Sequence, residues 1–434
     1  MVESATFIGN NSDDAKNRIM FKFLHTADLH LDSPLRGLRK REEASVETIL
    51  GATRRAFEKL IDLALDEEVD FMVIAGDVYD RDWKGYETGL FFRKQMLRLD
   101  GAGIPVFLIS GNHDAASVIT RKLTLPGNVR EFSSRSPDTK ELEGLPVALH
   151  GMSFPNRAVS ENLVPRYPDP VRGKFNIGIL HTSLAGSEGH DAYAPCKPEE
   201  LAGKGYDYWA LGHVHQPQIV SEDPWIVYPG CIQGRSVKEC GERGCRIVRV
   251  GDSFETGCDW HVLDEVRWAR ALVDVGGAES IGEVVDLVRE GIGREVEAAD
   301  GRLLAVRVEL TGVSRLHGEM HAQPERLEAE IAGVAEEFGD EAVWIERVRI
   351  KTKARTSLEE LARRDELTKL VIEAVREGEE SAERPGEVED MLKVLPGELK
   401  SELEAEWTGE GQRELYEDAC MMVLEELKTK GGEQ

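Results

Sequence analysis

Residues 20–31 read MFKFLHTADLHL, an apolar run with an aspartate and a histidine directly behind it. The apolar residues are typical of a buried strand. Asp28 and His30 are two positions apart, so at a strand end or in the loop after it they point to the same side. A carboxylate and an imidazole placed in this way can share one cation. The stretch therefore predicts a strand that leads into a metal-binding loop.

Four further segments repeat this order of an apolar run followed by polar side chains. They are Gly76-Asp77-Val78-Tyr79-Asp80, Ser110-Gly111-Asn112-His113-Asp114, Leu180-His181-Thr182 and Gly212-His213-Val214-His215. Each segment alone is compatible with an ordinary polar turn, but more than half of the chain's 11 histidines fall within the five. We therefore expect a single sheet to bring all five to one edge, where α/β folds bind ligands.

Apolar runs alternate with helical patterns from residue 20 to about residue 250. The runs expected as buried strands are Met20–Leu24, Phe71–Ala75, Val106–Ile109, Val147–Met152, Phe175–Leu180 and Tyr208–Leu211. Apolar residues recur at helical spacing from Val46 to Ile61 and from Leu90 to Leu99. Trp225–Tyr228 and Cys245–Val250 are expected to form a hairpin pair of a second sheet. This order predicts an α/β fold with a large mixed sheet core.

A second unit is expected to begin near residue 264, where the pattern becomes strand, helix, strand, helix, strand. Its predicted elements are Val266–Val275, Ile281–Glu290, Leu303–Leu310, Pro324–Phe338 and Ala342–Ile350. Residues 354–434 carry no strand pattern and favour helices rich in Glu and Leu. We therefore expect four regions: a flexible tail (1–19), a catalytic domain (20–264), a small α+β domain (265–353) and an acidic helical region (354–434).

The composition limits the class of protein. A chain of 434 residues with 41% hydrophobic and 31% charged residues fits a globular protein. No apolar run is long enough for a membrane helix and no signal peptide is evident, so we expect a cytoplasmic protein that does not bind membranes. The net charge of −27 disfavours nucleic-acid binding, although two bound divalent cations would offset part of it.

The series D-x-H, G-D, G-N-H-D, H and G-H-x-H resembles the calcineurin-like metallophosphoesterase superfamily over roughly residues 20–264. Within it, HTADLHL, GDVYD and the small domain that follows resemble the SbcD-type nucleases of DNA double-strand-break repair. The loops HTSLAGSEGHDAYAPC (181–196) and YPGCIQGRSVKECGERGC (228–245) are most similar to the YhaO-like branch, a DNA repair exonuclease group. The resemblance implies a four-layer αββα sandwich, a small α+β cap domain and a helical C-terminus.

The resemblance also implies two divalent metal ions, typically manganese in this family. Three residues would hold the first ion: Asp28, His30 and His215. Three would hold the second: Asn112, His181 and His213. Asp77 would bridge the two ions. Oxygen and imidazole ligands suit manganese, iron or zinc, so the donor set by itself leaves the metal open.

Other residues would act around the metals. His113 would lie near the leaving group, with Asp114 orienting or polarising it. Asp80 would lie behind the ligands, at a position where some relatives of this nuclease group have a histidine. His190, in a glycine-rich loop, and Arg235, in a basic loop that could contact phosphates, are candidates for substrate binding. Two histidines are expected to be structural: His25 and His150.

Together these features predict a metal-dependent phosphodiesterase, most directly a DNA exonuclease or endonuclease acting at duplex ends in repair. A metal-activated water would attack phosphorus, while His113 would stabilise or protonate the leaving oxygen. The resemblance implies an SbcC-like coiled-coil ATPase as partner of the helical C-terminus, which could equally pack on its own domain, and a homodimer. The same ligands would serve a phosphoesterase acting on a phosphoprotein, a cyclic nucleotide or a small phosphate ester. A non-enzymatic scaffold should have lost ligand positions, and none is missing.

Overall fold

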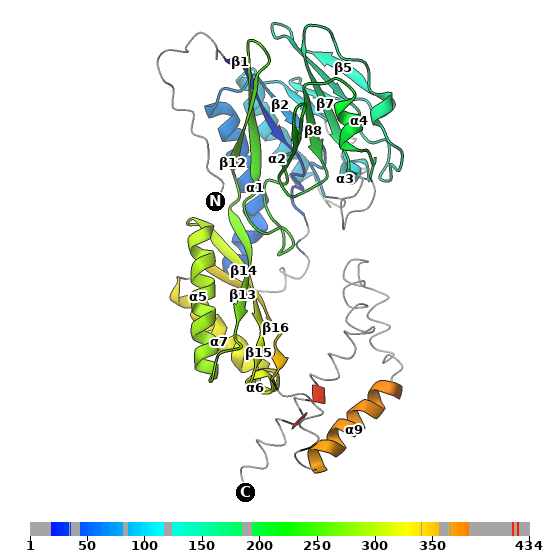
Figure 1. Cartoon of the computed structure of the whole chain (residues 1–434). Helices are drawn as coiled ribbons and strands as arrows, with labels where there is room; N and C mark the ends of the chain where they lie inside the picture. Colours follow the sequence, from blue (N-terminus) through cyan, green and yellow to red (C-terminus); the bar gives the residue numbers. More distant parts are fainter. Residues whose placement is uncertain are drawn as a thin grey trace, which may run out of the picture. The chain divides into compact units, whose positions relative to one another are not determined.

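The computed structural model divides the chain into two compact units, Met1–Trp268 (unit 1) and Ala269–Gln434 (unit 2) (Figure 1). It describes residues 19–33, 35, 44–80, 86–116, 124–184, 193–339, 341–355, 363, 366–381, 419–420 and 423–424. Except for Ile19, the tail expected over residues 1–19 lies outside these ranges. Among the described residues, no helix has the length and apolarity needed to cross a membrane.

The first sheet of unit 1 has six strands in the order β12-β11-β1-β2-β3-β4. In chain order these are β1 (Ile19–Thr26), β2 (Phe71–Ile74), β3 (Val106–Leu108), β4 (Val129–Glu131), β11 (Gly244–Gly251) and β12 (Thr256–Val262). β1 to β4 run parallel, because the helices α1 (Ala44–Asp66) and α2 (Glu87–Gly101) carry the chain back between the first three. β11 lies antiparallel between β1 and β12.

The second sheet has the order β5-β6-β7-β8-β10-β9. Its strands are β5 (Asp138–Glu141), β6 (Val147–Gly151), β7 (Phe175–His181), β8 (Tyr208–Gly212), β9 (Gln218–Glu222) and β10 (Trp225–Tyr228). The expected hairpin of Trp225–Tyr228 with Cys245–Val250 is wrong. β10 pairs with β8 and β9, whereas β11 belongs to the first sheet. Both runs are apolar and buried, and this pattern identifies a strand without identifying its partner.

The two sheets pack face to face and helices cover their outer faces. The central layer is built from aromatic and branched side chains of both sheets, including Phe21, Phe23, Phe71, Phe175, Ile177 and Tyr208. On the outer face of the first sheet, Leu24 and Met72 pack with Phe57 of α1 and Phe92 of α2. On the outer face of the second, Trp209 packs with Leu201 of α4 (Pro198–Ala202). The expected αββα sandwich is confirmed.

Unit 2 contains a three-stranded sheet in the order β13-β14-β16. The strands are β13 (Val266–Asp274), which begins in unit 1, β14 (Leu303–Thr311) and β16 (Val343–Ile350). Alternate strand residues such as Ala271, Val306 and Val308 pack in one core with α5 (Ile281–Ala299) and α7 (Pro324–Glu337). This is the α+β arrangement expected from the sequence.

Smaller elements complete unit 2. A two-stranded sheet joins β15 (Val313–Ser314) to β17 (Lys353–Ala354), and α6 (His317–Ala322) precedes α7. Of the C-terminal region, the structure describes α9 (Glu366–Ser381) and short helical pieces at 419–420 and 423–424. These described parts are helical, as expected.

Candidate metal centre

The five polar segments follow strands of both sheets: β1, β2 and β3 in the first sheet, β7 and β8 in the second. Backbone hydrogen bonds connect their loops, from Asp28 N–H to the Gly76 carbonyl (3.0 Å) and from Thr182 N–H to the Gly212 carbonyl (3.1 Å). The expectation that a single sheet carries all five is therefore wrong. Two packed sheets bring the carboxyl ends of their strands together, which gives the same convergence.

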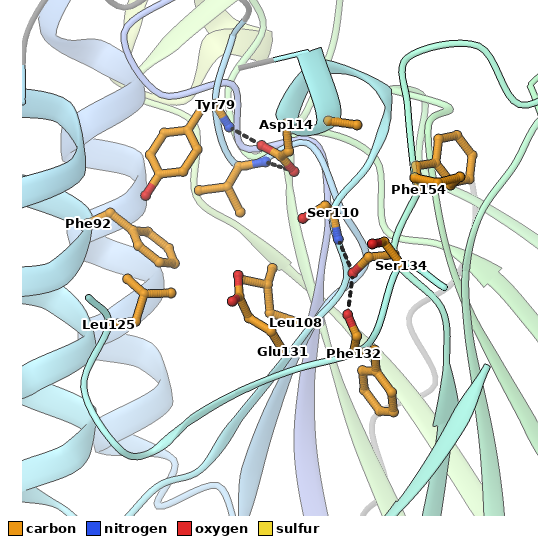
Figure 2. A pocket seen from close by; sticks show the side chains of 14 residues that line it. Tyr79, Phe92, Leu108, Ser110, Asp114, Leu125, Glu131, Phe132, Ser134 and Phe154 are labelled. Atoms are coloured by element: carbon orange, nitrogen blue, oxygen red, sulfur yellow. Dashed lines mark hydrogen bonds between the residues drawn. The ribbon is translucent and has the colours of Figure 1, made fainter. Parts of the chain in front are cut away.

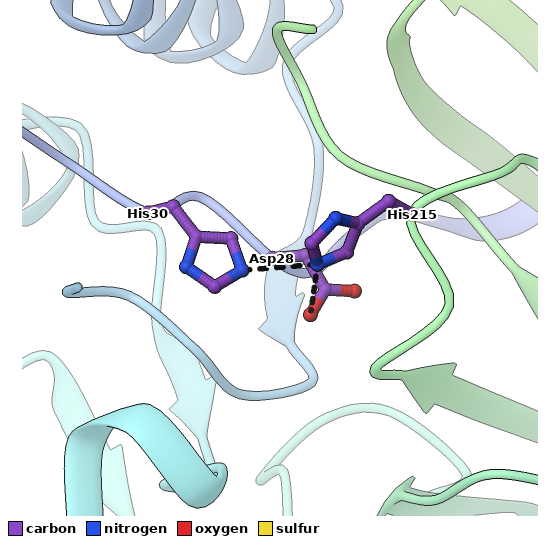
Figure 3. Close-up of side chains that lie close together, drawn as sticks. All are labelled: Asp28, His30 and His215. Atoms are coloured by element: carbon purple, nitrogen blue, oxygen red, sulfur yellow. Dashed lines mark hydrogen bonds and ion pairs between the residues drawn. The ribbon is translucent and has the colours of Figure 1, made fainter. Parts of the chain in front are cut away.

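Asp28, His30 and His215 form one group of possible ligands (Figure 3). The Nε2 atoms of His30 and His215 lie 3.1 Å apart, and His215 Nε2 lies 3.9 Å from Asp28 Oδ1. One ligand atom from each residue falls within 4.8 Å of the others. Asp28 and His30 are buried, and His215 is partly exposed. Three donors that converge in this way can hold one cation.

Asp77 lies between this group and a second one. Its Oδ2 is 3.9 Å from His30 Nε2 and 3.3 Å from His181 Nε2. Asp28, Asp77 and His181 also form a group within 4.8 Å, so the two carboxylates reach both sides of the cluster. Asp77 therefore has the position that a carboxylate bridging two metal ions requires.

Asn112 and His213 complete the cluster on the side of His181. Asn112 Oδ1 lies 3.0 Å from His181 Nε2. The ring centroids of His181 and His213 are 5.3 Å apart, and the His213 backbone N–H donates to Asp28 Oδ2 at 2.9 Å. The structure thus brings together all seven side chains that the sequence suggests as ligands.

The backbone around the cluster is strained. Four of the candidate ligands have positive φ: Asp28 (52°), His30 (43°), Asp77 (52°) and His213 (98°). Such conformations cost on the order of 1–3 kcal/mol each for residues other than glycine, and they cluster at functional sites. Two flanking glycines leave no space for a side chain. A Cβ at Gly111 would lie 2.3 Å from Asp77 Oδ1, and a Cβ at Gly212 would lie 2.0 Å from the carbonyl oxygen of Ala75. The backbone of these loops therefore has the conformation that directs the candidate ligand side chains toward the cluster.

Burial and neighbouring charges set the electrostatics of the cluster. Burial raises the pKa of Asp28 and lowers the pKa of His30 well below its usual value. Burial acts on Asp77 as well, but the adjacent His181 imidazolium brings the pKa of Asp77 down to about 2. Against its own burial, the Asp77 carboxylate raises the pKa of His181 to about 9. These donors, carboxylate oxygen and imidazole nitrogen without thiolate, fit divalent cations such as manganese, iron or zinc.

His113 is held by Asp80. Its Nδ1 lies 2.9 Å from Asp80 Oδ1, and Ser33 Oγ donates to the other oxygen of Asp80 at 2.6 Å. The His113 backbone N–H donates to Asp77 Oδ1 at 2.9 Å, which places the residue beside the candidate bridging carboxylate. His113 therefore reaches the cluster with one ring nitrogen fixed by a carboxylate.

Asp114 has a different role from the expected one of orienting His113. Its carboxylate accepts hydrogen bonds from the backbone N–H groups of Val78 (3.2 Å), Tyr79 (2.9 Å) and Gly111 (3.2 Å) (Figure 2). Consecutive residues of α3 (Asn112–Ala116) point in different directions, so Asp114 fastens the loops while Asp80 meets the His113 ring. Behind these loops Asp114 lines a cavity of about 490 Å³ together with Tyr79 and Glu131.

Arg235 contacts protein carboxylates. Its Nη2 donates to Glu239 Oε1 at 2.9 Å, and its Nη1 lies 3.7 Å from Asp80 Oδ2. Glu239, which sequence reasoning missed, lies 2.6 Å from His215 Nδ1. The R-x-x-x-E spacing indicates only the contact between Arg235 and Glu239. His190, the other candidate for substrate binding, lies outside the described residues.

Two histidines are structural, as expected. His25 Nδ1 lies 3.0 Å from the Tyr208 hydroxyl, and burial lowers the pKa of His25 to about 3. His150 lies between Thr139 Oγ1 (2.9 Å) and Asn176 Oδ1 (3.0 Å) within the second sheet. Both are therefore core residues of the sandwich.

Comparisons with known proteins agree with this site. The calcineurin-like phosphoesterase family matches residues 21–217, and the middle domain of metallophosphoesterase YhaO matches residues 268–353. The "Uncharacterized metallophosphoesterase YhaO" of Bacillus subtilis (strain 168) is 39% identical over 272 residues, which cover 62% of this chain and 66% of that protein. The chain thus matches just under two thirds of the length of that relative.

More distant relatives were also found. The "DNA double-strand break repair protein Mre11" of Methanopyrus kandleri is 27% identical over 420 residues, covering 88% of this chain and 87% of that protein. A solved dimetal phosphatase from Danio rerio superposes with a TM-score of 0.38 at 11% identity, over 57% of this chain and 98% of that one. From the matched domains and the gathered candidate ligands, we conclude that residues 21–217 form a calcineurin-like phosphoesterase domain and residues 268–353 a YhaO middle domain.

Proposed function

We propose that this metallophosphoesterase hydrolyses phosphodiester bonds of DNA ends, as an exonuclease or endonuclease in repair. The observation that carries the proposal is the cluster in which Asp77 lies between His30 and His181, with His113 beside it. The relative named as a double-strand break repair protein, which aligns over 88% of this chain, supports DNA as the substrate. In this proposal the small α+β domain expected over residues 265–353 acts as a cap that shapes access of DNA to the site.

Each candidate ligand has a place in the proposed mechanism. The first ion would be held by Asp28, His30 and His215. The second would be held by Asn112, His181 and His213. Asp77 would bind both. When bound, the two ions, which we propose to be manganese, neutralise charge on the phosphate and lower the pKa of a water molecule.

His113 would act on the leaving group. With Nδ1 directed at Asp80, the ring keeps Nε2 for the substrate. The imidazolium donates its proton to the leaving oxygen as the bond to phosphorus breaks. Asp114 supports this step indirectly, since it fixes the backbone on either side of the site. Asp80 is thus proposed to position His113.

Partners and location follow from the same proposal. We propose that the chain works in the cytoplasm, as a homodimer, with an SbcC-like coiled-coil ATPase bound to its helical C-terminal region. A second candidate function is hydrolysis of a smaller phosphoester, such as a cyclic nucleotide or a phosphoprotein. The net charge of −27 favours this alternative, because it opposes binding of a polyanion.

The test is release of labelled nucleotides from linear duplex DNA with manganese, compared with magnesium and with EDTA. Wild type should release nucleotides only with a divalent metal. His113→Ala should lose about 100- to 10,000-fold in rate, the usual contribution of a general acid, while still binding metal. Hydrolysis of bis(p-nitrophenyl) phosphate without any release from DNA would favour the smaller substrate. Absence of both, with metal bound, would refute the proposed chemistry.

A further inference from the structure

A carboxylate contacts the ring nitrogen of His215 that faces away from the cluster. Its Nδ1 lies 2.6 Å from Glu239 Oε1, while its Nε2 faces Asp28 and His30. If Nδ1 donates to Glu239, the lone pair lies on Nε2, the nitrogen that faces the cluster. Donation to a carboxylate also makes an imidazole a stronger metal ligand. Arg235 Nη2 lies 3.2 Å from the same Nδ1, but the shorter contact with Glu239 favours the tautomer with the proton on Nδ1, which leaves Nε2 to a metal.

His181, on the other side of the cluster, is supported differently. Its Nδ1 donates to the backbone carbonyl of Ala75 at 2.9 Å. A carbonyl fixes the tautomer but adds no negative charge, so it strengthens the ligand less than a carboxylate does. Of these two histidines, His215 is therefore the one whose Nδ1 contacts a carboxylate.

Arg235 extends the support of His215 to the leaving-group side. Its backbone N–H and its Nη2 both donate to Glu239, at 2.7 Å and 2.9 Å. Its Nη1 lies 3.7 Å from Asp80, whose other oxygen meets His113 Nδ1. The side chains of Arg235, Asp80 and Glu239 are only 17%, 17% and 12% exposed, so solvent screens these charges weakly.

The loop that carries this network is anchored by a buried arginine. Arg243 is 1% exposed, and its guanidinium donates to the backbone carbonyls of His215 (3.0 Å) and Cys240 (2.6 Å). It also donates to Gln216 Oε1 at 3.0 Å. These bonds hold the backbone of His215 against the segment that contains Glu239, so the contact between the two side chains is built into the fold.

We propose that Glu239 and Arg235 are positioning residues that connect the first metal position to His113. A continuous series of polar contacts runs from His215 through Glu239, Arg235 and Asp80 to His113. Glu239 would strengthen metal binding at the group with His215, and Arg235 would make the orientation of His113 depend on that group. The inference rests on the proposed metal site and on the role proposed for His113.

Manganese titration of the metal-free full-length protein by calorimetry tests the role of Glu239 without any substrate. Glu239→Gln should weaken one of two binding sites by about 10- to 100-fold and leave the other unchanged. Glu242→Gln is the matched control, because Glu242 lies in the same loop and bonds to Trp260 Nε1. Unchanged affinity in Glu239→Gln, or equal weakening in both variants, would overturn the inference. A wild type that binds no manganese would overturn the proposed function as well.

A double-mutant cycle tests the connection through Arg235. The kcat for bis(p-nitrophenyl) phosphate at saturating manganese is measured for Glu239→Gln, Asp80→Asn and the double variant. The two effects should be non-additive when Arg235 is present and additive in the Arg235→Gln background. Additive effects in both backgrounds would refute the connection. The cycle uses a substrate other than DNA. It therefore tests the connection through Arg235 even if the protein does not cleave DNA.

Discussion

Units 1 and 2 use left-handed backbone for different purposes. Among the described residues other than glycine, all with positive φ lie in unit 1 except Asp300. Asp300 follows the last residue of α5 and ends that helix, an ordinary use of this conformation. In unit 1 positive φ occurs at eight such residues, and four of these are candidate ligands: Asp28, His30, Asp77 and His213. There it directs polar side chains toward one point.

The cores of the two units differ in the same sense. The main core of unit 2 is apolar and packs Val284, Val288 and Ile292 of α5 against its sheet. Unit 1 has apolar cores as well, but it also buries two carboxylates and several imidazoles side by side. Natural proteins break local rules of stability mainly where function requires it. The comparison therefore predicts opposite responses to substitution in the two units.

The largest effect is expected for Asp77→Asn. Asp77 lies 3.9 Å from His30 and 3.3 Å from His181, one ligand of each proposed ion, so the rate of phosphodiester hydrolysis should fall at least about 1,000-fold, or roughly 4 kcal/mol in the barrier. In EDTA the change in stability should be small, because relief of the repulsion between Asp28 and Asp77 opposes the loss of the buried pairing of Asp77 with His181. Rates and thermal unfolding in EDTA measure the two effects. Asp62→Asn, at an exposed residue paired with Arg98, is the control. A large loss of stability in EDTA would show that Asp77 is needed for folding.

The next effect is expected for Ile292→Ala in unit 2. Ile292 is fully buried, and truncation to alanine in such a core costs about 2–5 kcal/mol. Urea unfolding followed by circular dichroism should show this loss, while hydrolysis of bis(p-nitrophenyl) phosphate stays at the wild-type rate. The matched control is Leu272→Ala, since Leu272 is 63% exposed and its loss should change stability by less than about 0.5 kcal/mol. Loss of hydrolysis in the folded Ile292→Ala protein would contradict the contrast between the units.

The strands that could be predicted from the sequence are those in the interior of the sandwich. β1, β2, β3, β6, β7 and β8 are apolar and buried, and the predicted bounds agree within two residues. β4, β5 and β9 were missed because they are short and polar; β5 reads DTKE and is partly exposed. The pairing of β10 and β11 also escaped prediction, since it depends on contacts distant in sequence.

The candidate ligands could be predicted because each follows an apolar strand, and the fold brings strand ends together. The partners of those ligands could not. Asp80 and Asp114 are both close to His113 in the structure, and sequence alone does not tell which of them meets its ring. Glu239 lies 24 positions from His215, and no local pattern connects the two. Such contacts depend on how the loops fold over the sheet edge.

The smallest expected effect is the pH dependence of stability that comes from His25, a buried histidine of unit 1. Burial lowers the pKa of His25 to about 3 in the folded protein, against about 6.5 in the unfolded chain. Below pH 6.5 the unfolded chain therefore binds more protons, and the free energy of unfolding falls as pH decreases toward 3. Between pH 7 and pH 5 the loss should be about 2 kcal/mol.

His25→Gln separates this titration from that of other groups, because glutamine can bond to the Tyr208 hydroxyl but does not titrate. In EDTA, the stability of the variant relative to wild type should rise by about 2 kcal/mol between pH 7 and pH 5, as seen by urea unfolding of unit 1. A difference that stays constant over this range would mean that His25 takes up a proton in the folded state as readily as in the unfolded chain. Burial at the core of unit 1 would then not exclude charge from His25.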